Sequence, residues 1–91
     1  MSRTREARLK AVYFAWVRER IGKPEEELAV PASVTNVAEL VAWLSARGEE
    51  YAYAFENPKV IRAAIDRVHV KPEAKIAAAS EIAFFPPMTG G

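Results

Sequence analysis

The residues that most restrict the fold of this chain form two apolar segments, one near each end. Leu9 to Val17 is an apolar run broken only by Lys10, and it is rich in β-branched and aromatic side chains. Such a run is typical of a strand that is buried on both faces, which is usually central in a sheet. Ile82 to Phe85 forms a second apolar strand close to the end of the sequence. We therefore expect these two strands to lie side by side in the middle of one sheet.

One helix is clearly marked between these two strands. Asn36 and Glu39 have the spacing of a capping box, in which the first side chain caps the helix and the second reaches back. Gly48 stands where a helix-ending glycine belongs, so the pattern predicts a helix from about Val37 to Arg47. The apolar face of this helix comprises the residues that recur at helical spacing, namely Val37, Leu40, Val41 and Leu44.

The remaining segments read as short strands, turns and one helical turn. Strands are expected over 27–30, 60–65 and 68–70, tight turns over 18–22 and at Asp66-Arg67, and a short helical turn over 49–56. This order of elements indicates an α+β fold, with a mixed sheet and one main helix across one face. If the first and last strands run parallel in the middle of the sheet, the fold is the β-grasp, or ubiquitin-like, arrangement.

Length and composition restrict the number of domains and the class of function. The 91 residues suit a single domain, and we expect a flexible arm over 1–8, a β-grasp domain over 9–87 and a flexible tail over 88–91. The net charge of +1 does not predict binding to nucleic acid or to membranes. The sequence lacks cysteine, metal-ligand spacing and a phosphate-binding loop, so we expect no thiol nucleophile, no metal site and no bound cofactor. Without a signal peptide or a membrane span, a cytoplasmic protein is expected.

The end of the sequence has the features of a reactive tail. No ionisable side chain follows Glu81, so the terminal carboxylate is the only charge in this stretch. Glycines have no Cβ and can thread a narrow channel, whereas a proline pair stiffens the exit from the sheet. Extended, the last four residues would reach about 13 Å. The residues concerned are Phe84-Phe85-Pro86-Pro87-Met88-Thr89-Gly90-Gly91.

Four segments of the sequence carry a resemblance to a known family, in the order that the family has them. They are V-Y-F-A-W-V-R-E at 12–19, N-V-A-E-L at 36–40, A-A-I-D at 63–66 and S-E-I-A-F-F-P-P-M-T-G-G at 80–91. Through them the chain resembles the small subunits of molybdopterin synthase, which are ubiquitin-like sulfur carriers. The closing F-F-P-P-x-T-G-G is specific, whereas a terminal Gly-Gly alone would not be.

The resemblance implies a chemistry centred on Gly91, with Gly90 beside it. An E1-like adenylating enzyme would use ATP to activate the carboxylate, and a sulfurtransferase would supply the sulfur of a thiocarboxylate. Gly91 would then deliver sulfur to cyclic pyranopterin monophosphate in the active site of the synthase large subunit. The implied assembly is a heterotetramer of small and large subunits. The chain would be a non-catalytic subunit, so its classification as an enzyme stays open.

A partner is expected to dock on the aromatic residues that precede the tail. The predicted contacts are Phe14, Phe84, Phe85, Pro86, Pro87, Met88 and Thr89. On a central strand, one of Phe84 and Phe85 must face the helix and the other the uncovered face, and the sequence leaves open which does so. Lone His69 is expected on a strand surface or edge. Two other functions stay open: a sulfur carrier for thiamine synthesis or tRNA thiolation, and a ubiquitin-like conjugation tag or binding module.

Overall fold

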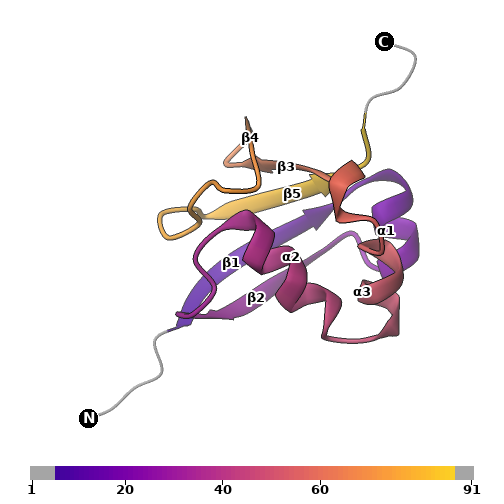
Figure 1. Cartoon of the computed structure of the whole chain (residues 1–91), viewed down its shortest axis with the longest axis horizontal. Helices are drawn as coiled ribbons and strands as arrows, with labels where there is room; N and C mark the ends of the chain where they lie inside the picture. The colour runs from indigo at the N-terminus through magenta and orange to yellow at the C-terminus, as the bar shows by residue number, and fades with distance from the viewer. Residues whose placement is uncertain (1–5, 88–91) are drawn as a thin grey trace.

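A computed structural model of the chain describes residues 6–87, which form a five-stranded mixed sheet with helices packed against it (Figure 1). The elements in order are β1 (Glu6–Tyr13), α1 (Ala15–Ile21), β2 (Glu25–Pro31), α2 (Val37–Ser45), α3 (Glu49–Ala54), a 3₁₀ turn η1 (Pro58–Val60), β3 (Arg62–Ile65), β4 (Val68–Val70) and β5 (Glu81–Phe85). Within these residues, no helix combines the length and apolar character needed to cross a bilayer.

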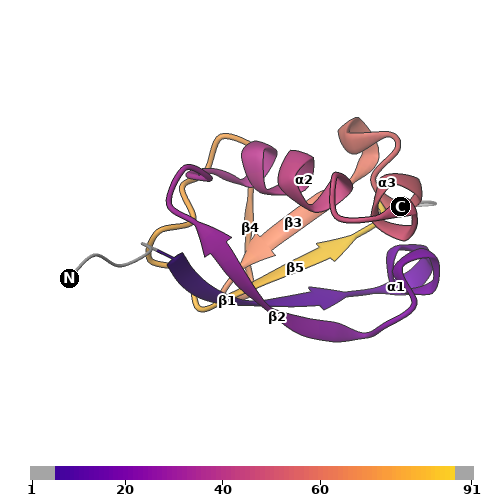
Figure 2. The same ribbon diagram turned by 90° about the horizontal axis from the view of Figure 1, so that it is seen from below.

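The sheet has the topology that the two apolar strands predict. Its strand order is β2-β1-β5-β3-β4, and β1 runs parallel to β5 while all other neighbouring pairs are antiparallel. The helices α2 and α3 lie on one face of the sheet, and within residues 6–87 no helix covers the opposite face (Figure 2). The α+β, β-grasp prediction is therefore confirmed, and β5 occupies the centre of the sheet.

The core lies between the sheet and α2. Alternate residues of β1 and β5 point inward, as the two-residue period of a strand requires. The side chains on α2 that recur at helical spacing meet them, and each such buried residue contributes roughly 1.5–3 kcal/mol by leaving water. The most deeply buried members of this layer are Leu9, Ala11, Tyr13, Leu40, Leu44, Ile82 and Phe84.

The cap at the start of α2 is confirmed, whereas the predicted end is wrong. The Glu39 N–H donates to Asn36 Oδ1 at 2.8 Å, and Glu39 Oε1 accepts from the Thr35 N–H at 2.7 Å. The helix ends at Ser45, because its last turn tightens through a bond from the Arg47 N–H to the Leu44 carbonyl oxygen at 2.9 Å. Gly48 instead precedes α3 with an extended φ of 172°, so it does not end α2 in a left-handed conformation.

The first apolar run is not one strand, which corrects the prediction for residues 9–22. Strand β1 begins at Glu6, so residues 6–8 belong to the sheet and not to the predicted arm. It ends at Tyr13, and the chain turns into α1, which buries Val17 and Ile21 one helical turn apart. Gly22 ends α1 with a φ of 93°, and its N–H donates to the Arg18 carbonyl oxygen at 2.8 Å. The expected turn over 18–22 is therefore the second half of a helix.

Ala15 carries the strain of this strand-to-helix transition. Its φ of 55° lies in the left-handed region, which costs an L-residue with a Cβ about 1–2 kcal/mol. We expect Ala15→Gly to raise the free energy of unfolding by about 0.5–1 kcal/mol, after the greater freedom of glycine in the unfolded chain is subtracted. Urea denaturation measures the change. The matched control is Ala42→Gly in the middle of α2, which should lower stability by about 1 kcal/mol. A loss of stability at both positions would contradict the assignment of strain to Ala15.

Candidate functional site

The end of β5 separates its two phenylalanines onto opposite faces of the sheet. Phe84 is fully buried, stacked on Tyr13 with ring centroids 6.3 Å apart and edge-on to Phe55 at 5.3 Å. Phe85 is half-buried on the other face, where its ring meets His69 at 5.2 Å. The expectation that one ring would serve the core is confirmed, and the ring is that of Phe84. The Phe84 side chain is therefore not part of the accessible surface, and its predicted contact with a partner stays a prediction.

The predicted residues that remain accessible gather at the carboxyl end of β5. The Phe14 N–H donates to the Phe84 carbonyl oxygen at 3.1 Å, and the parallel register pairs Tyr13 with Phe84. Because the backbone of Phe14 is still extended, its side chain points to the face opposite Tyr13, which is also the face of Phe85. Phe14 is 48% exposed, and Pro86 and Pro87 are half-buried. We call Phe14, Phe85, Pro86 and Pro87 the docking surface.

His69 is a neighbour of this surface that sequence reasoning did not connect with it. It lies exposed on the edge strand β4, as expected for its own position, and its ring packs edge-on against Phe85. The hairpin of β3 and β4 was visible in the sequence as two short strands around Asp66-Arg67. The pairing of β3 with β5 was not visible, because no local pattern specifies which strands meet. Met88, Thr89, Gly90 and Gly91 lie outside the described residues, so their roles stay predictions.

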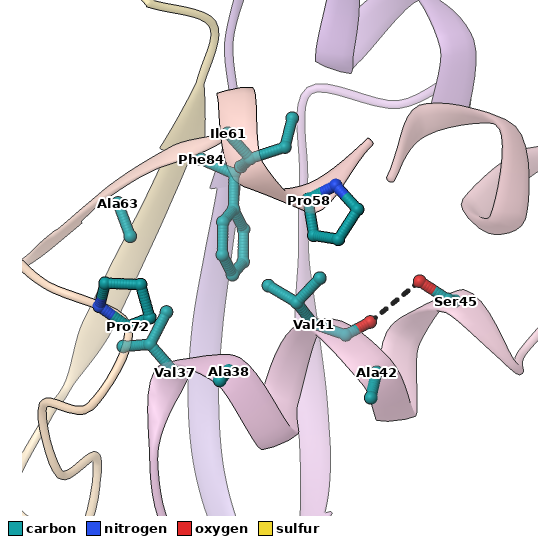
Figure 3. A pocket seen from close by; sticks show the side chains of 10 residues that line it. All are labelled: Val37, Ala38, Val41, Ala42, Ser45, Pro58, Ile61, Ala63, Pro72 and Phe84. Carbon is teal, nitrogen blue, oxygen red and sulfur yellow. Dashed lines mark hydrogen bonds between the residues drawn. The ribbon is translucent and has the colours of Figure 1, made fainter. Parts of the chain in front are cut away.

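An apolar cleft opens between α2 and the start of β3, with a volume of about 230 Å³ (Figure 3). Phe84 points into it toward Val41, and small side chains of α2 form its rim. The one hydroxyl in its lining, that of Ser45, donates to the Val41 carbonyl oxygen at 2.9 Å. Among residues 6–87, no cluster of His, Cys, Asp and Glu has the arrangement to hold a metal ion. The cleft therefore offers neither a free nucleophile nor an acid–base group.

The main polar cluster of the fold centres on Glu26, away from the docking surface. Tyr13 and Tyr51 donate to Glu26 Oε2 at 2.8 and 2.6 Å. Lys23 Nζ and Arg47 Nη1 lie 3.5 and 3.6 Å from Oε1. Burial by itself raises the pKa of Glu26, but the two phenol hydrogen bonds and the two cations together hold that pKa below its usual value. Burial, followed by the bond to Glu26, raises the pKa of Tyr13. These contacts join β1, β2, α3 and the turn that follows α2.

Stability is expected to depend on pH through Glu26. Because its pKa is lowered on folding, its contribution is complete above the unfolded-state value of about 4.3 and is lost as pH falls through the folded value. We expect Glu26→Gln to cost about 1.5–3 kcal/mol at neutral pH, as hydrogen bonds to a charged group do, and less in acid. The control Glu27→Gln removes an exposed carboxylate paired with Arg8, worth about 0–1 kcal/mol. Urea denaturation of both variants at neutral and acidic pH measures this. If Glu26→Gln lowered the free energy of unfolding equally at neutral and acidic pH, the expected role of the Glu26 carboxylate would be contradicted.

Comparisons with known sequences match most of the chain. A family model described as the ThiS family matches residues 11–91. The molybdopterin synthase sulfur carrier subunit of Escherichia coli is 35% identical over 83 residues, which cover 91% of this chain and 99% of that protein. The subunit of the same name from Haemophilus influenzae is 33% identical over 87 residues, again covering 91% and 99%.

Solved structures share the fold at lower identity. A putative molybdopterin converting factor, subunit 1, from Pyrococcus furiosus has a TM-score of 0.71 at 22% identity, covering 90% of this chain and 99% of that one. The small archaeal modifier protein 1 from Haloferax volcanii has a TM-score of 0.69 at 20% identity, covering 93% and 100%. These two likenesses support the β-grasp fold alone. Because the family model spans nearly the whole sequence and agrees with both sulfur carrier subunits, the chain belongs to the ThiS family.

Proposed function

We propose that this chain is the sulfur carrier subunit of molybdopterin synthase, and that Gly91 is the residue that carries the sulfur. The observation on which this rests is the match to two molybdopterin synthase sulfur carrier subunits over 99% of their length. The family match extends to Gly91 and so includes the sequence of the tail. The fold supports the proposal, because β5 is a rigid central strand that leads directly to the segment concerned.

The chemistry begins with activation, since a carboxylate is a poor acylating group. A carboxylate oxygen of Gly91 attacks the α-phosphate of ATP, and pyrophosphate leaves, which gives an acyl adenylate. A sulfur nucleophile then attacks the carbonyl carbon, and AMP departs with the electron pair of the broken C–O bond. When that nucleophile is the outer sulfur of a cysteine persulfide, the product is an acyl disulfide. A second thiol then attacks the cysteine sulfur of the S–S bond, so that the thiocarboxylate leaves with the electron pair and the two thiols end as a disulfide. An E1-like adenylating enzyme and a sulfurtransferase are proposed for these two steps, because the described residues of this chain supply no group for them.

The second half of the cycle takes place in the large subunit. The thiocarboxylate sulfur of Gly91 attacks a side-chain carbon of cyclic pyranopterin monophosphate there and displaces the oxygen substituent of that carbon. Water then cleaves the acyl C–S bond of the resulting thioester, which leaves the sulfur on the pterin and returns the carboxylate of Gly91. Two carriers would supply the two sulfurs of the dithiolene. The docking surface suits this contact, because aromatic side chains at the centre of an interface contribute most of its affinity. An uncharged tail also enters a partner without stranding a buried charge.

Intact-mass spectrometry after incubation with ATP, the adenylating enzyme and a sulfur donor tests the proposal. We expect the mass gain that corresponds to replacement of one oxygen by sulfur, located in the peptide that contains Gly91. Mixing this product with the large subunit and cyclic pyranopterin monophosphate should consume the thiocarboxylate and yield molybdopterin. An unchanged mass, or a product in which Gly91 forms an isopeptide bond to lysine, would contradict the proposal. Consumption by a thiazole synthase in place of the large subunit would assign the carrier to thiamine synthesis.

A further inference from the structure

Arg20 stands at the centre of an aromatic cluster on the surface that α1 and α3 form together. Its guanidinium carbon lies 4.5 Å from the ring centroid of Trp16 and 4.1 Å from that of Tyr53. Nη1 donates to the Tyr53 carbonyl oxygen at 3.2 Å and to Glu56 Oε2 at 3.4 Å. The Arg20 side chain is 27% exposed and Tyr53 is 53% exposed. We call Trp16, Arg20 and Tyr53 the arginine–aromatic cluster.

This cluster adjoins the docking surface. Phe14, the most exposed member of that surface, is also the N-cap of α1, and Trp16 and Arg20 follow on the first two turns of the helix. Hydrogen bonding of the Phe14 N–H to the Phe84 carbonyl oxygen holds the start of α1 against the end of β5. Both α1 and α3 lie at the end of the sheet toward which β5 points (Figures 1 and 2). Both surfaces therefore lie at the same end of the sheet, where β5 ends.

The guanidinium of Arg20 is placed to bind a carboxylate. Both hydrogen bonds that it makes within residues 6–87 use Nη1, which leaves Nη2 and Nε for another acceptor. Its contact with two rings restrains the side chain, and the planar fork of arginine is pre-organised, so less conformational freedom is lost when a two-pronged pair forms with a carboxylate. Glu56 does not saturate it, because that pair is single, 3.4 Å long and has a carboxylate side chain that is 60% exposed. Tryptophan, tyrosine and arginine are also the residue types most enriched in binding hot spots.

We propose that the arginine–aromatic cluster is a second contact region for the large subunit of molybdopterin synthase, and that it receives an Asp or Glu side chain of that subunit against Arg20. This inference rests on the proposed function, which supplies the partner. Its support is the continuity of the cluster with the docking surface through Phe14 at the start of α1, and the positive charge of Arg20 that two aromatic rings hold at the surface. The alternative is that Arg20 only holds α1 against α3 within the chain. The two readings differ in what the loss of the guanidinium changes: affinity for the large subunit in the first, and stability alone in the second.

Binding of the purified large subunit to carrier variants, measured by calorimetry, tests the inference. We expect Arg20→Met to weaken binding about 10- to 30-fold, as truncation of a hot-spot residue does. The affinity of the wild type should also fall as salt is raised, and Arg20→Met should lose most of that dependence. Arg8→Met is the matched control, since Arg8 also pairs with one exposed glutamate but lies at the far end of β1. It should change affinity by less than about two-fold.

Two further variants keep the test decisive if Arg20→Met folds poorly. Arg20→Lys retains the charge but not the planar fork, and should weaken binding about 3- to 10-fold. Glu56→Gln removes the competing carboxylate within the chain, and should tighten binding about two-fold. Unchanged affinity in Arg20→Met and Arg20→Lys would overturn the inference while leaving the proposed function intact, provided that binding still requires Gly91. Failure of the wild type to bind the large subunit would overturn both.

Discussion

Phe84→Ala is expected to lower the free energy of unfolding by about 3–5 kcal/mol, which is the cost of emptying a large buried aromatic site. Phe84 has no exposed surface and contacts both Tyr13 and Phe55 with its ring. It also forms the floor of the apolar cleft below α2, so the cavity left by the substitution would open toward solvent. A domain of this size has a total stability of roughly 5–15 kcal/mol, and the variant should therefore be at the margin of folding.

Phe85→Ala is the matched comparison, because it removes the same ring one residue later. Phe85 lies half-buried on the uncovered face, where its ring contact is with His69. We expect a stability loss of no more than about 1 kcal/mol and a fall in affinity for the large subunit of about 30-fold or more. Thermal unfolding and calorimetric titration together measure the pair. Equal stability losses at the two positions would contradict the assignment of Phe84 to the core and Phe85 to the docking surface.

The assignment of these two rings illustrates what the sequence was able to predict. The two-residue period of a strand requires Phe84 and Phe85 to face opposite ways, and this followed from the sequence alone. Which of them faces α2 depends on the register between β1 and β5, where Tyr13 is paired with Phe84. Register is determined by the packing of the whole inner layer, and the sequence of neither strand specifies it alone. The topology was predictable for a different reason. The two strongly apolar strands near the ends of the chain can bury both of their faces only at the centre of the sheet, so they were expected to be neighbours there.

The segment from Phe14 to Gly22 was predicted wrongly because two periods overlap in it. Phe14, Trp16 and their neighbours are apolar or aromatic and continue the composition of β1, which favours a longer strand. Val17 and Ile21 have the four-residue spacing of a helix, but one pair is too short to outweigh the apolar run. The turn itself uses a left-handed alanine, and no propensity rule places that conformation at Ala15. The error hid the arginine–aromatic cluster, which exists only because α1 presents Trp16 and Arg20 on one face.

Removal of Gly91 is expected to abolish sulfur transfer while leaving the fold unchanged. The shortened chain still ends in a carboxylate on glycine, but that carboxylate reaches about 3.3 Å less far from β5. Misplacement of a reacting group by about 1 Å already costs on the order of a hundredfold in rate, so a displacement of this size should eliminate measurable transfer. The contacts that stabilise the fold within residues 6–87 end before this residue, and the unfolding temperature should be unchanged.

Gly91→Ala separates two expected requirements of the tail, namely its full length and the absence of a side chain on its last residue. This variant keeps the full length and the terminal carboxylate, and adds only a Cβ and the restriction of φ that comes with it. If the partners receive the tail in a narrow channel, thiocarboxylate formation should fall well below the wild-type rate but exceed that of the deletion. Mass spectrometry of the C-terminal peptide measures the first step, and molybdopterin formation measures the second. Transfer by the deleted chain at the wild-type rate would show that Gly91 does not carry the sulfur. Equal activity of Gly91→Ala and the wild type would instead show that the tail must have its full length but need not end in a residue without a side chain.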